Sequence, residues 1–213
     1  MFDLDHTLVR CDSFAGFNRR LLLNDWWRAA LTIAASPAIV LLWSRKRTRS
    51  VAVSALLWIG TIGQSGRLDE LMSAFVTRQF ASRSLVCTEA VAQLQRHVRD
   101  GDRVVVVTGA AESLARRVCA RIGCDGVEVV GSTLRLWHGG WVGGESCKGD
   151  AKIRMLAGRR IEAPWDCVYT DSAADLPLLM QARRRVLVNP RPRSRARVAE
   201  VLGTDVEVVV WEG

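Results

Sequence analysis

Two aspartates at the start of the chain have the spacing of a reactive pair. Asp3 and Asp5 are separated by a single residue, and two apolar residues precede Asp3. If residues 1–4 end a β-strand, both carboxylates leave its C-terminal edge, where open α/β sheets bind ligands. Such a pair can divide the work, one carboxylate acting as nucleophile or metal ligand and the other as general acid and base. Acidic turns and helix N-caps also contain Asp-x-Asp, so the pair alone leaves both interpretations open.

Further polar residues stand at the ends of two more predicted strands. The β-branched run 104–107 ends in Thr108 and Gly109, which predicts a buried strand that offers a hydroxyl at its tip. A second short run, 166–170, leads to Asp171 and Asp175. Because ligands bind at the carboxyl edge of such sheets, these side chains are expected to meet the N-terminal aspartates there.

In this order the segments resemble the four motifs of the haloacid dehalogenase-like phosphohydrolases, in their phosphoserine-phosphatase-like subfamily. The third motif of that family corresponds to the stretch from Cys147 to Leu156, and the resemblance spans nearly the whole chain. It implies an α/β fold with a Rossmann-like core and a mostly parallel sheet. It also implies a magnesium-dependent phosphatase that works through an aspartyl-phosphate intermediate.

The resemblance also implies catalytic roles. Asp3 would attack phosphorus, and Asp5 would protonate the leaving group and then activate water. Thr108 and Gly109 would bind phosphoryl oxygens. Asp5 argues against dehalogenase chemistry, because that reaction needs no such acid.

Magnesium suits a site built from oxygen ligands. The family pattern places the Asp3 carboxylate, the Asp5 main-chain carbonyl and Asp171 around the ion, with Asp175 supporting it.

Two lysines are candidates for neutralising the aspartyl-phosphate. Lys152 precedes Ile153 and Leu156, the start of a helical apolar face, and matches the Lys-x-x-x-Leu pattern of the family. Lys152 is therefore favoured as the catalytic, phosphate-binding lysine. Lys148 remains as a charge that could steer the phosphate.

The chain departs from the family pattern at its start. His6 stands where the family usually has glycine, so a non-glycine residue there could need a positive φ. Only Met1 and Phe2 precede Asp3, whereas strands commonly have about five residues. Either the strand begins upstream of Met1 or the central strand is unusually short.

The length of 213 residues suits one domain with an insertion. Residues 1–12 and 84–213 are expected to form the phosphohydrolase core, and residues 13–83 a helical cap inserted after the first strand. Leu68, Met72 and Phe75 recur at helical spacing within that segment. A cap of this kind excludes water and shapes the substrate pocket.

The predicted cap has an unusual composition. Trp26 and Trp27 precede an apolar stretch, residues 29–43, which contains Pro37 and is followed by a second stretch, residues 51–62. A basic cluster separates the two stretches and consists of Arg45, Lys46, Arg47 and Arg49. Tryptophans and basic residues beside apolar runs are typical of membrane interfaces. Because the first stretch is shorter than the ~20 residues of a membrane span, we expect an interfacial or re-entrant hairpin at an anionic membrane. The alternative is a soluble cap packed on the core.

The remaining composition adds few constraints. The net charge is +8, and no segment has a nucleic-acid-binding motif, so no nucleic-acid partner is expected. The six cysteines show no paired metal spacing and are expected to be free thiols.

Within the superfamily the chain most resembles bacterial phosphatidylglycerophosphatases of the C type. The resemblance rests on the apolar hairpin and on residues 56–63, 147–152 and 171–179. It implies hydrolysis of phosphatidylglycerophosphate to phosphatidylglycerol at the cytoplasmic face of the bacterial inner membrane. One alternative is a cytoplasmic phosphatase for a small phosphomonoester such as phosphoserine. Another is a non-catalytic, membrane-associated adaptor.

Overall fold

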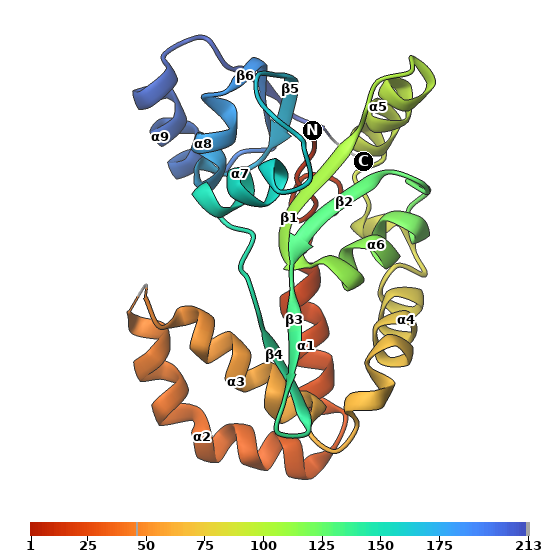
Figure 1. Ribbon diagram of the computed structural model, residues 1–213, viewed down its shortest axis with the longest axis vertical. Helices are drawn as coiled ribbons and strands as arrows, with labels where there is room; N and C mark the ends of the chain where they lie inside the picture. Colours follow the sequence, from red (N-terminus) through yellow and green to blue (C-terminus); the bar gives the residue numbers. More distant parts are fainter. Residues whose placement is uncertain (46, 212–213) are drawn as a thin grey trace.

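The computed structural model describes residues 1–45 and 47–211 (Figure 1). Lys46, one of the residues of the predicted basic cluster, lies outside the described residues.

A parallel β-sheet is the centre of the fold. Residues 1–3 lie in the middle of this sheet, and every neighbouring pair is parallel. From one edge to the other the order is β2 (Glu128–Ser132), β1 (Val105–Ala111), residues 1–3, β5 (Trp165–Thr170), β6 (Ala182–Val188) and β7 (Glu207–Val209). The predicted α/β class with a Rossmann-like core is confirmed.

Helices cover both faces of the sheet (Figure 1). Side chains alternate between the faces of a strand, so Val106 packs into one core cluster while Val105 and Val107 pack into the other. The helices on the Val106 side are α5 (Thr88–Arg99) and α6 (Glu112–Arg121). Those on the opposite side are α7 (Asp150–Ala157), α8 (Leu176–Leu179) and α9 (Pro192–Leu202). Burial on both faces explains why β1 begins with a continuous apolar run.

The first three residues pair on both sides although the segment is short. The Phe2 amide donates to Val105 O at 2.9 Å, and Phe2 O accepts from the Val107 amide at 2.8 Å. On the other side the Asp3 amide donates to Tyr169 O at 2.9 Å. The Phe2 ring stacks on the Tyr169 ring with centroids 4.3 Å apart. Asp3 is therefore held at the end of the central strand.

Residues 13–79 contain the helices α1 (Ser13–Leu23), α2 (Trp26–Ser44), α3 (Arg49–Thr61) and α4 (Leu68–Gln79). We call them the inserted helices. In α1, the Asp12 side chain caps the helix by accepting from the Ala15 amide at 2.7 Å. Phe17 of α1 and Phe75 of α4 are buried and meet edge-to-face, with centroids 5.6 Å apart. The predicted helical periodicity of Leu68, Met72 and Phe75 corresponds to the buried face of α4.

Helix α2 lies mostly outside the packed interior. Arg28 is its one buried residue, and the Arg28 guanidinium donates to the Ile59, Gly60 and Ile62 carbonyls at 2.7–2.9 Å. Since these carbonyls end α3, Arg28 ties α2 to α3. Pro37 lies inside α2 without ending it.

By length and composition, α2 is the one described helix that could cross a membrane. It has 19 residues, so it is longer than the apolar run 29–43 that the sequence indicated. Only 6% of its apolar window is buried. The alternative of a soluble cap expects α2 to pack on the core. In the structure most of α2 is not buried in this way.

A β-hairpin that the sequence analysis did not foresee extends from the core to the inserted helices (Figure 1). Its strands are β3 (Leu134–Trp137) and β4 (Gly140–Gly143), which pair antiparallel. The Trp58 indole of α3 donates to Trp137 O at 3.1 Å, and the Trp141 amide donates to the Thr61 hydroxyl at 2.8 Å. The hairpin thus joins α3 to the chain segment that enters α7.

Candidate active site

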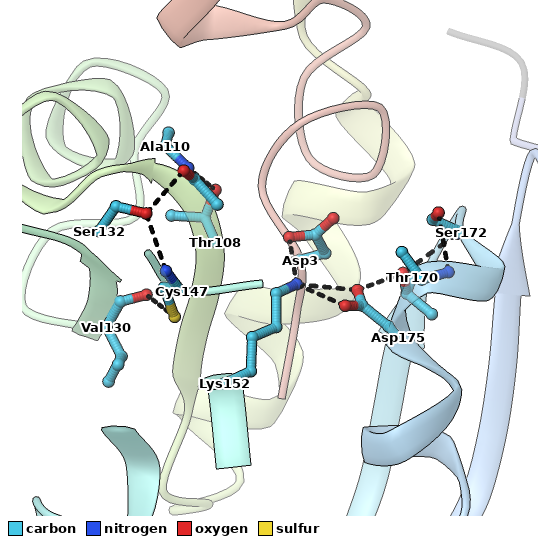
Figure 2. A network of polar contacts seen from close by, with 12 residues as sticks. Asp3, Thr108, Ala110, Val130, Ser132, Cys147, Lys152, Thr170, Ser172 and Asp175 are labelled. Atoms are coloured by element: carbon cyan, nitrogen blue, oxygen red, sulfur yellow. Dashed lines mark hydrogen bonds and ion pairs between the residues drawn. The ribbon is translucent and has the colours of Figure 1, made fainter. Parts of the chain in front are cut away.

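A buried lysine connects two carboxylates from distant parts of the chain. Figure 2 shows Lys152 of α7 pointing toward Asp3, at the end of the central strand, and toward Asp175, just before α8. The Lys152 ammonium lies 3.1 Å from Asp3 Oδ1 and 2.8 Å from Asp175 Oδ2, and the residue is 4% exposed. The Thr170 hydroxyl also donates to Asp175 Oδ2 at 2.8 Å. The sequence analysis did not single out Thr170, although it directly precedes Asp171 at the end of β5.

Burial and ion pairing act against each other in this cluster. Burial would lower the pKa of Lys152, but Asp3 and Asp175 outweigh it and raise that pKa, so the ammonium stays charged. Burial raises the pKa of Asp3, against the effect of Lys152, and Asp175 and Asp5 add to the rise. One cation between neighbouring carboxylates leaves this group of side chains able to accept a further positive charge.

Asp5 lies in the tight turn that follows the central strand. The Leu4 carbonyl accepts from the Leu8 amide at 2.9 Å, and His6 adopts φ 61°, the left-handed conformation that the departure from glycine implied. The Ser13 amide, at the start of α1, donates to Asp5 Oδ1 at 2.9 Å. Burial raises the pKa of Asp5 to about 6, against this hydrogen bond. A carboxyl group that titrates near neutrality suits a general acid and base.

The end of β1 supplies neutral polar groups. Thr108 is fully buried, and its hydroxyl accepts from the Ala110 amide at 3.1 Å. The Ser132 hydroxyl donates to Gly109 O at 2.9 Å and accepts from the Cys147 amide at 2.9 Å (Figure 2). Ser132 thus connects the predicted phosphate-binding residues to the segment that contains Lys148. Sequence patterns did not indicate Ser132, because its role depends on the pairing of β2 with β1.

Asp171 and Lys148 are placed differently from Lys152. Asp171, at the end of β5, is 9% exposed, and burial raises its pKa, while His6 and Arg191 oppose the rise. Lys148 is exposed and its side chain lies over Gly109. The structure therefore brings Lys152, rather than Lys148, to the predicted nucleophile.

The predicted metal ligands do not form a side-chain cluster by themselves. Among residues 1–45 and 47–211, no three His, Cys, Asp or Glu side chains lie close enough to hold a metal ion. Only two of the predicted direct ligands are carboxylates, Asp3 and Asp171, and the third is the main-chain carbonyl of Asp5. Magnesium is commonly bound by one or two carboxylates, with waters and substrate phosphate completing its shell. The donor set is therefore of the right chemical kind for magnesium.

The cysteines are free thiols in the described part of the chain, as expected. Cys87, Cys119, Cys124 and Cys147 are buried, and Cys11 and Cys167 are partly exposed. Burial raises the pKa of the Cys147 thiol to about 11. A thiol with so high a pKa is a poor nucleophile at neutral pH, so the cysteines are structural residues.

Comparison with known proteins gives one family and several related folds. The model of the haloacid dehalogenase-like hydrolase family matches residues 1–180. A protein of unknown function from Bordetella pertussis Tohama I has a TM-score of 0.75 at 22% identity, with 98% of this chain and 96% of that chain covered. A substrate-bound phosphoserine phosphatase has a TM-score of 0.61 at 13% identity, covering 97% and 90% of the two chains. A phospho-aspartyl intermediate analogue of phosphoserine phosphatase has a TM-score of 0.57 at 14% identity, covering 100% and 91%.

The family match and the charged residues at the end of the central strand together support one enzyme class. The protein is a phosphoric monoester hydrolase. The chain belongs to the haloacid dehalogenase-like hydrolase family. At their levels of identity the solved structures establish the fold alone. The substrate is a separate question, because one fold serves many substrates.

Proposed function

We propose that the enzyme is a magnesium-dependent phosphatase in which Asp3 is the nucleophile. The observation that carries this proposal is the buried arrangement of Asp3, Lys152 and Asp175 at the end of the central strand. Lys152 holds the Asp3 carboxylate in one position and favours its anionic form, which a carboxylate nucleophile requires.

The chain's own residues account for both steps of the reaction, the phosphorylation of Asp3 and the hydrolysis of the aspartyl-phosphate. Asp3 Oδ attacks phosphorus and forms an acyl-phosphate bond, while the bond from phosphorus to the leaving oxygen breaks. Asp5 gives its proton to that oxygen, and so releases an alcohol. Asp5, now anionic, then takes a proton from water as the water oxygen attacks phosphorus. The acyl-phosphate bond breaks, inorganic phosphate leaves, and Asp3 is a carboxylate again.

Magnesium would be held by Asp3, Asp171 and the Asp5 carbonyl, with Asp175 supporting the site through Lys152. The raised pKa values of Asp3 and Asp171 fit a dication, because at both carboxylates the effect of burial outweighs that of the positive charges nearby. When bound, the ion neutralises negative charge on the phosphoryl group. Thr108 and Gly109 would bind phosphoryl oxygens beside it.

A lipid phosphate, phosphatidylglycerophosphate, is the substrate that we propose. The supporting observation is the exposed apolar surface of α2, where Trp26 is 84% exposed, Ile33 72% and Val40 66%. Arg45, Arg47 and Arg49 follow directly in the turn to α3. Apolar insertion combined with attraction to anionic lipid is the pair of signals that membrane-surface helices use. Both signals support our proposal that the enzyme acts on the anionic cytoplasmic face of the bacterial inner membrane.

A cytoplasmic phosphatase for a small phosphomonoester is the second candidate. The folds of phosphoserine phosphatases favour it, since they cover almost the whole chain. A non-catalytic adaptor is disfavoured, because an adaptor has no need of a buried lysine between Asp3 and Asp175.

One assay separates these candidates. Phosphate release is measured with and without Mg²⁺, from detergent-solubilised phosphatidylglycerophosphate and from phosphoserine, and Asp3→Asn serves as the catalytic blank. We expect Mg²⁺-dependent release with a higher kcat/KM for the lipid phosphate. A preference for phosphoserine would replace the lipid substrate by the small metabolite. Activity that survives in Asp3→Asn would overturn the nucleophile, and no wild-type activity on either ester would favour the adaptor.

A further inference from the structure

The tip of the β3–β4 hairpin exposes two large apolar side chains. Leu136 is 57% exposed and Trp137 is 48% exposed, and His138 and Gly139 form the turn between the two strands. Because neighbouring residues of a strand point to opposite faces, Leu136 and Trp137 lie on the two sides of the hairpin. A partner that covers both side chains must therefore meet the tip end-on.

The inserted helices hold this tip in place. The Trp58 indole of α3 meets Trp137 edge-to-face, with ring centroids 6.3 Å apart, and donates to Trp137 O at 3.1 Å. Gly140 lies so close to Trp58 that an added β-carbon would be 2.6 Å from Trp58 Cδ1. Further along β4, the Gly143 amide donates to the Ser54 hydroxyl of α3 at 3.1 Å. The exposed side chains thus project from a hairpin that is packed and hydrogen-bonded to α3.

The tip and the start of α2 meet at the same end of α3. The Gly63 amide, just after α3, donates to Gly139 O at 3.3 Å. The preceding residue, Ile62, accepts at its carbonyl oxygen from the Arg28 guanidinium at 2.9 Å. Arg28 lies in the first turn of α2 and covers the ring of Trp27, 4.3 Å from its centroid. The hairpin tip therefore lies near the tryptophan-bearing end of α2 (Figure 1).

We propose that the hairpin tip is a second membrane-contacting element, which inserts Leu136 and Trp137 end-on into the head-group region of an anionic bilayer. The inference rests on the proposed function, which assigns membrane contact to α2 alone. A tryptophan beside an aliphatic side chain suits the membrane interface, because the indole has an apolar body and a polar N–H group. Arg135, the preceding residue of β3, is exposed and supplies attraction to anionic lipid.

Contact at the tip orients the active site relative to the membrane. A single helix that lies on a bilayer is free to roll about its own axis. Because the hairpin packs on α3, its tip lies to one side of the axis of α2, and a second contact there prevents rolling. The strand β3 begins just after β2 ends at Ser132, at the carboxyl edge of the sheet. The hairpin therefore holds this edge, where Asp3 lies, at a fixed distance from the lipid surface.

The first test compares Leu136→Ser with Met180→Ser. Met180 is 58% exposed, so both changes remove an apolar side chain of similar exposure, but Met180 precedes β6 at the opposite edge of the sheet. Binding is measured by sedimentation with vesicles of phosphatidylcholine and phosphatidylglycerol. Leu136→Ser should bind about tenfold more weakly than wild type, because a leucine side chain is withdrawn from lipid. Met180→Ser should bind as wild type does.

The outcomes separate this proposal from the proposed function. If Leu136→Ser binds like Met180→Ser while replacement of Trp26, Ile33 and Trp43 by Ser releases the protein, the tip is not a contact element and docking through α2 stands. If wild-type protein does not bind the vesicles, membrane contact is overturned for the tip and for α2 alike. The chemistry assigned to Asp3 is judged separately, from turnover of p-nitrophenyl phosphate.

Trp137 supplies a second readout, which does not depend on affinity. The emission lost in Trp137→Phe isolates the fluorescence of Trp137, and Trp165→Phe does the same for a buried tryptophan of β5. Phenylalanine keeps an apolar ring at each position, so the folded protein should persist. On phosphatidylglycerol vesicles with brominated acyl chains, the emission of Trp137 should be quenched and that of Trp165 should not. Emission of Trp137 that stays unquenched in vesicle-bound protein would contradict insertion of the tip.

Discussion

The Lys152 ammonium and the Asp3 carboxylate lie 3.1 Å apart, although the two residues are 149 positions apart in the sequence. Their contact joins the end of the central strand, which contains Asp3, to α7, which contains Lys152. Asp175 completes the cluster from the segment before α8.

Removal of the Lys152 charge should destabilise the protein. In Lys152→Met, Asp3 and Asp175 remain buried without their shared cation, which typically costs about 3 kcal/mol in the free energy of unfolding. Urea denaturation at pH 7 without metal should show this loss. The loss should shrink at pH 4, because burial raises the pKa of Asp3 and its carboxyl group is then protonated. A variant as stable as wild type at pH 7 would contradict the assigned ion pairs.

Asp5→Asn should separate the two halves of the reaction. p-Nitrophenolate leaves without needing a proton, so Asp3 can still be phosphorylated by p-nitrophenyl phosphate. Asparagine cannot activate water, so the aspartyl-phosphate should accumulate. Rapid-mixing kinetics should show a burst of about one nitrophenolate per enzyme, followed by turnover ~10²–10⁴-fold slower than in wild type. Slow product formation with no burst would argue against Asp5 as the base of the second step.

The buried Asp5 carboxyl should make stability depend on pH. Because its native pKa is about 6, above the ordinary aspartate value, the native state keeps a proton between pH 4 and 6 that the unfolded state loses. The free energy of unfolding should fall as the pH rises through this window. Asp5→Asn lacks this penalty and can still accept the Ser13 hydrogen bond. It should be about 3 kcal/mol more stable than wild type at pH 7.5 in EDTA, and equally stable below pH 4.

The exposed face of α2 should bind anionic membranes. Trp26, Ile33 and Trp43 are exposed, so replacing all three by Ser removes apolar surface without disturbing the core. Partitioning onto vesicles of phosphatidylcholine and phosphatidylglycerol should fall by about tenfold or more, and high salt should weaken wild-type binding. Turnover of p-nitrophenyl phosphate should be unchanged, because the Asp3 site lies elsewhere.

A matched control for this experiment replaces three exposed apolar residues outside α2, namely Val98, Met180 and Val201, by Ser. Its sedimentation with vesicles should equal that of wild type. If wild-type protein stays in the supernatant, or both triple variants lose binding equally, α2 is not the docking element.

Local sequence patterns were sufficient for the core of the fold. The run 104–107 has apolar residues on both faces, which predicted a buried strand, and residues 105–107 are the first three residues of β1. The spacing of Leu68, Met72 and Phe75 predicted α4 because helical periodicity is a property of neighbouring residues. Asp3, Asp5, Thr108 and Asp171 were also recognisable, since each stands just after a short apolar segment.

Other features depend on contacts between distant segments. The sequence offered both Lys148 and Lys152, and only packing of α7 against the sheet buries Lys152 beside Asp3. The β3–β4 hairpin was missed, although residues 133–136 alternate polar and apolar side chains and His138-Gly139 forms the turn that follows. Its position on α3 follows from hydrogen bonds to Trp58 and Thr61, which no local pattern encodes.

The family, the parallel core and the residue types of the site could be predicted from the sequence alone, because strand ends and periodicity are local properties. The tertiary structure decided which lysine meets the nucleophile, where the hairpin packs and which face of α2 remains open. Arg28 illustrates the reason: its charge can be buried only where α3 ends and leaves carbonyls unpaired. Such pairing depends on how the helices meet in space, and the sequence specifies that only through the whole fold.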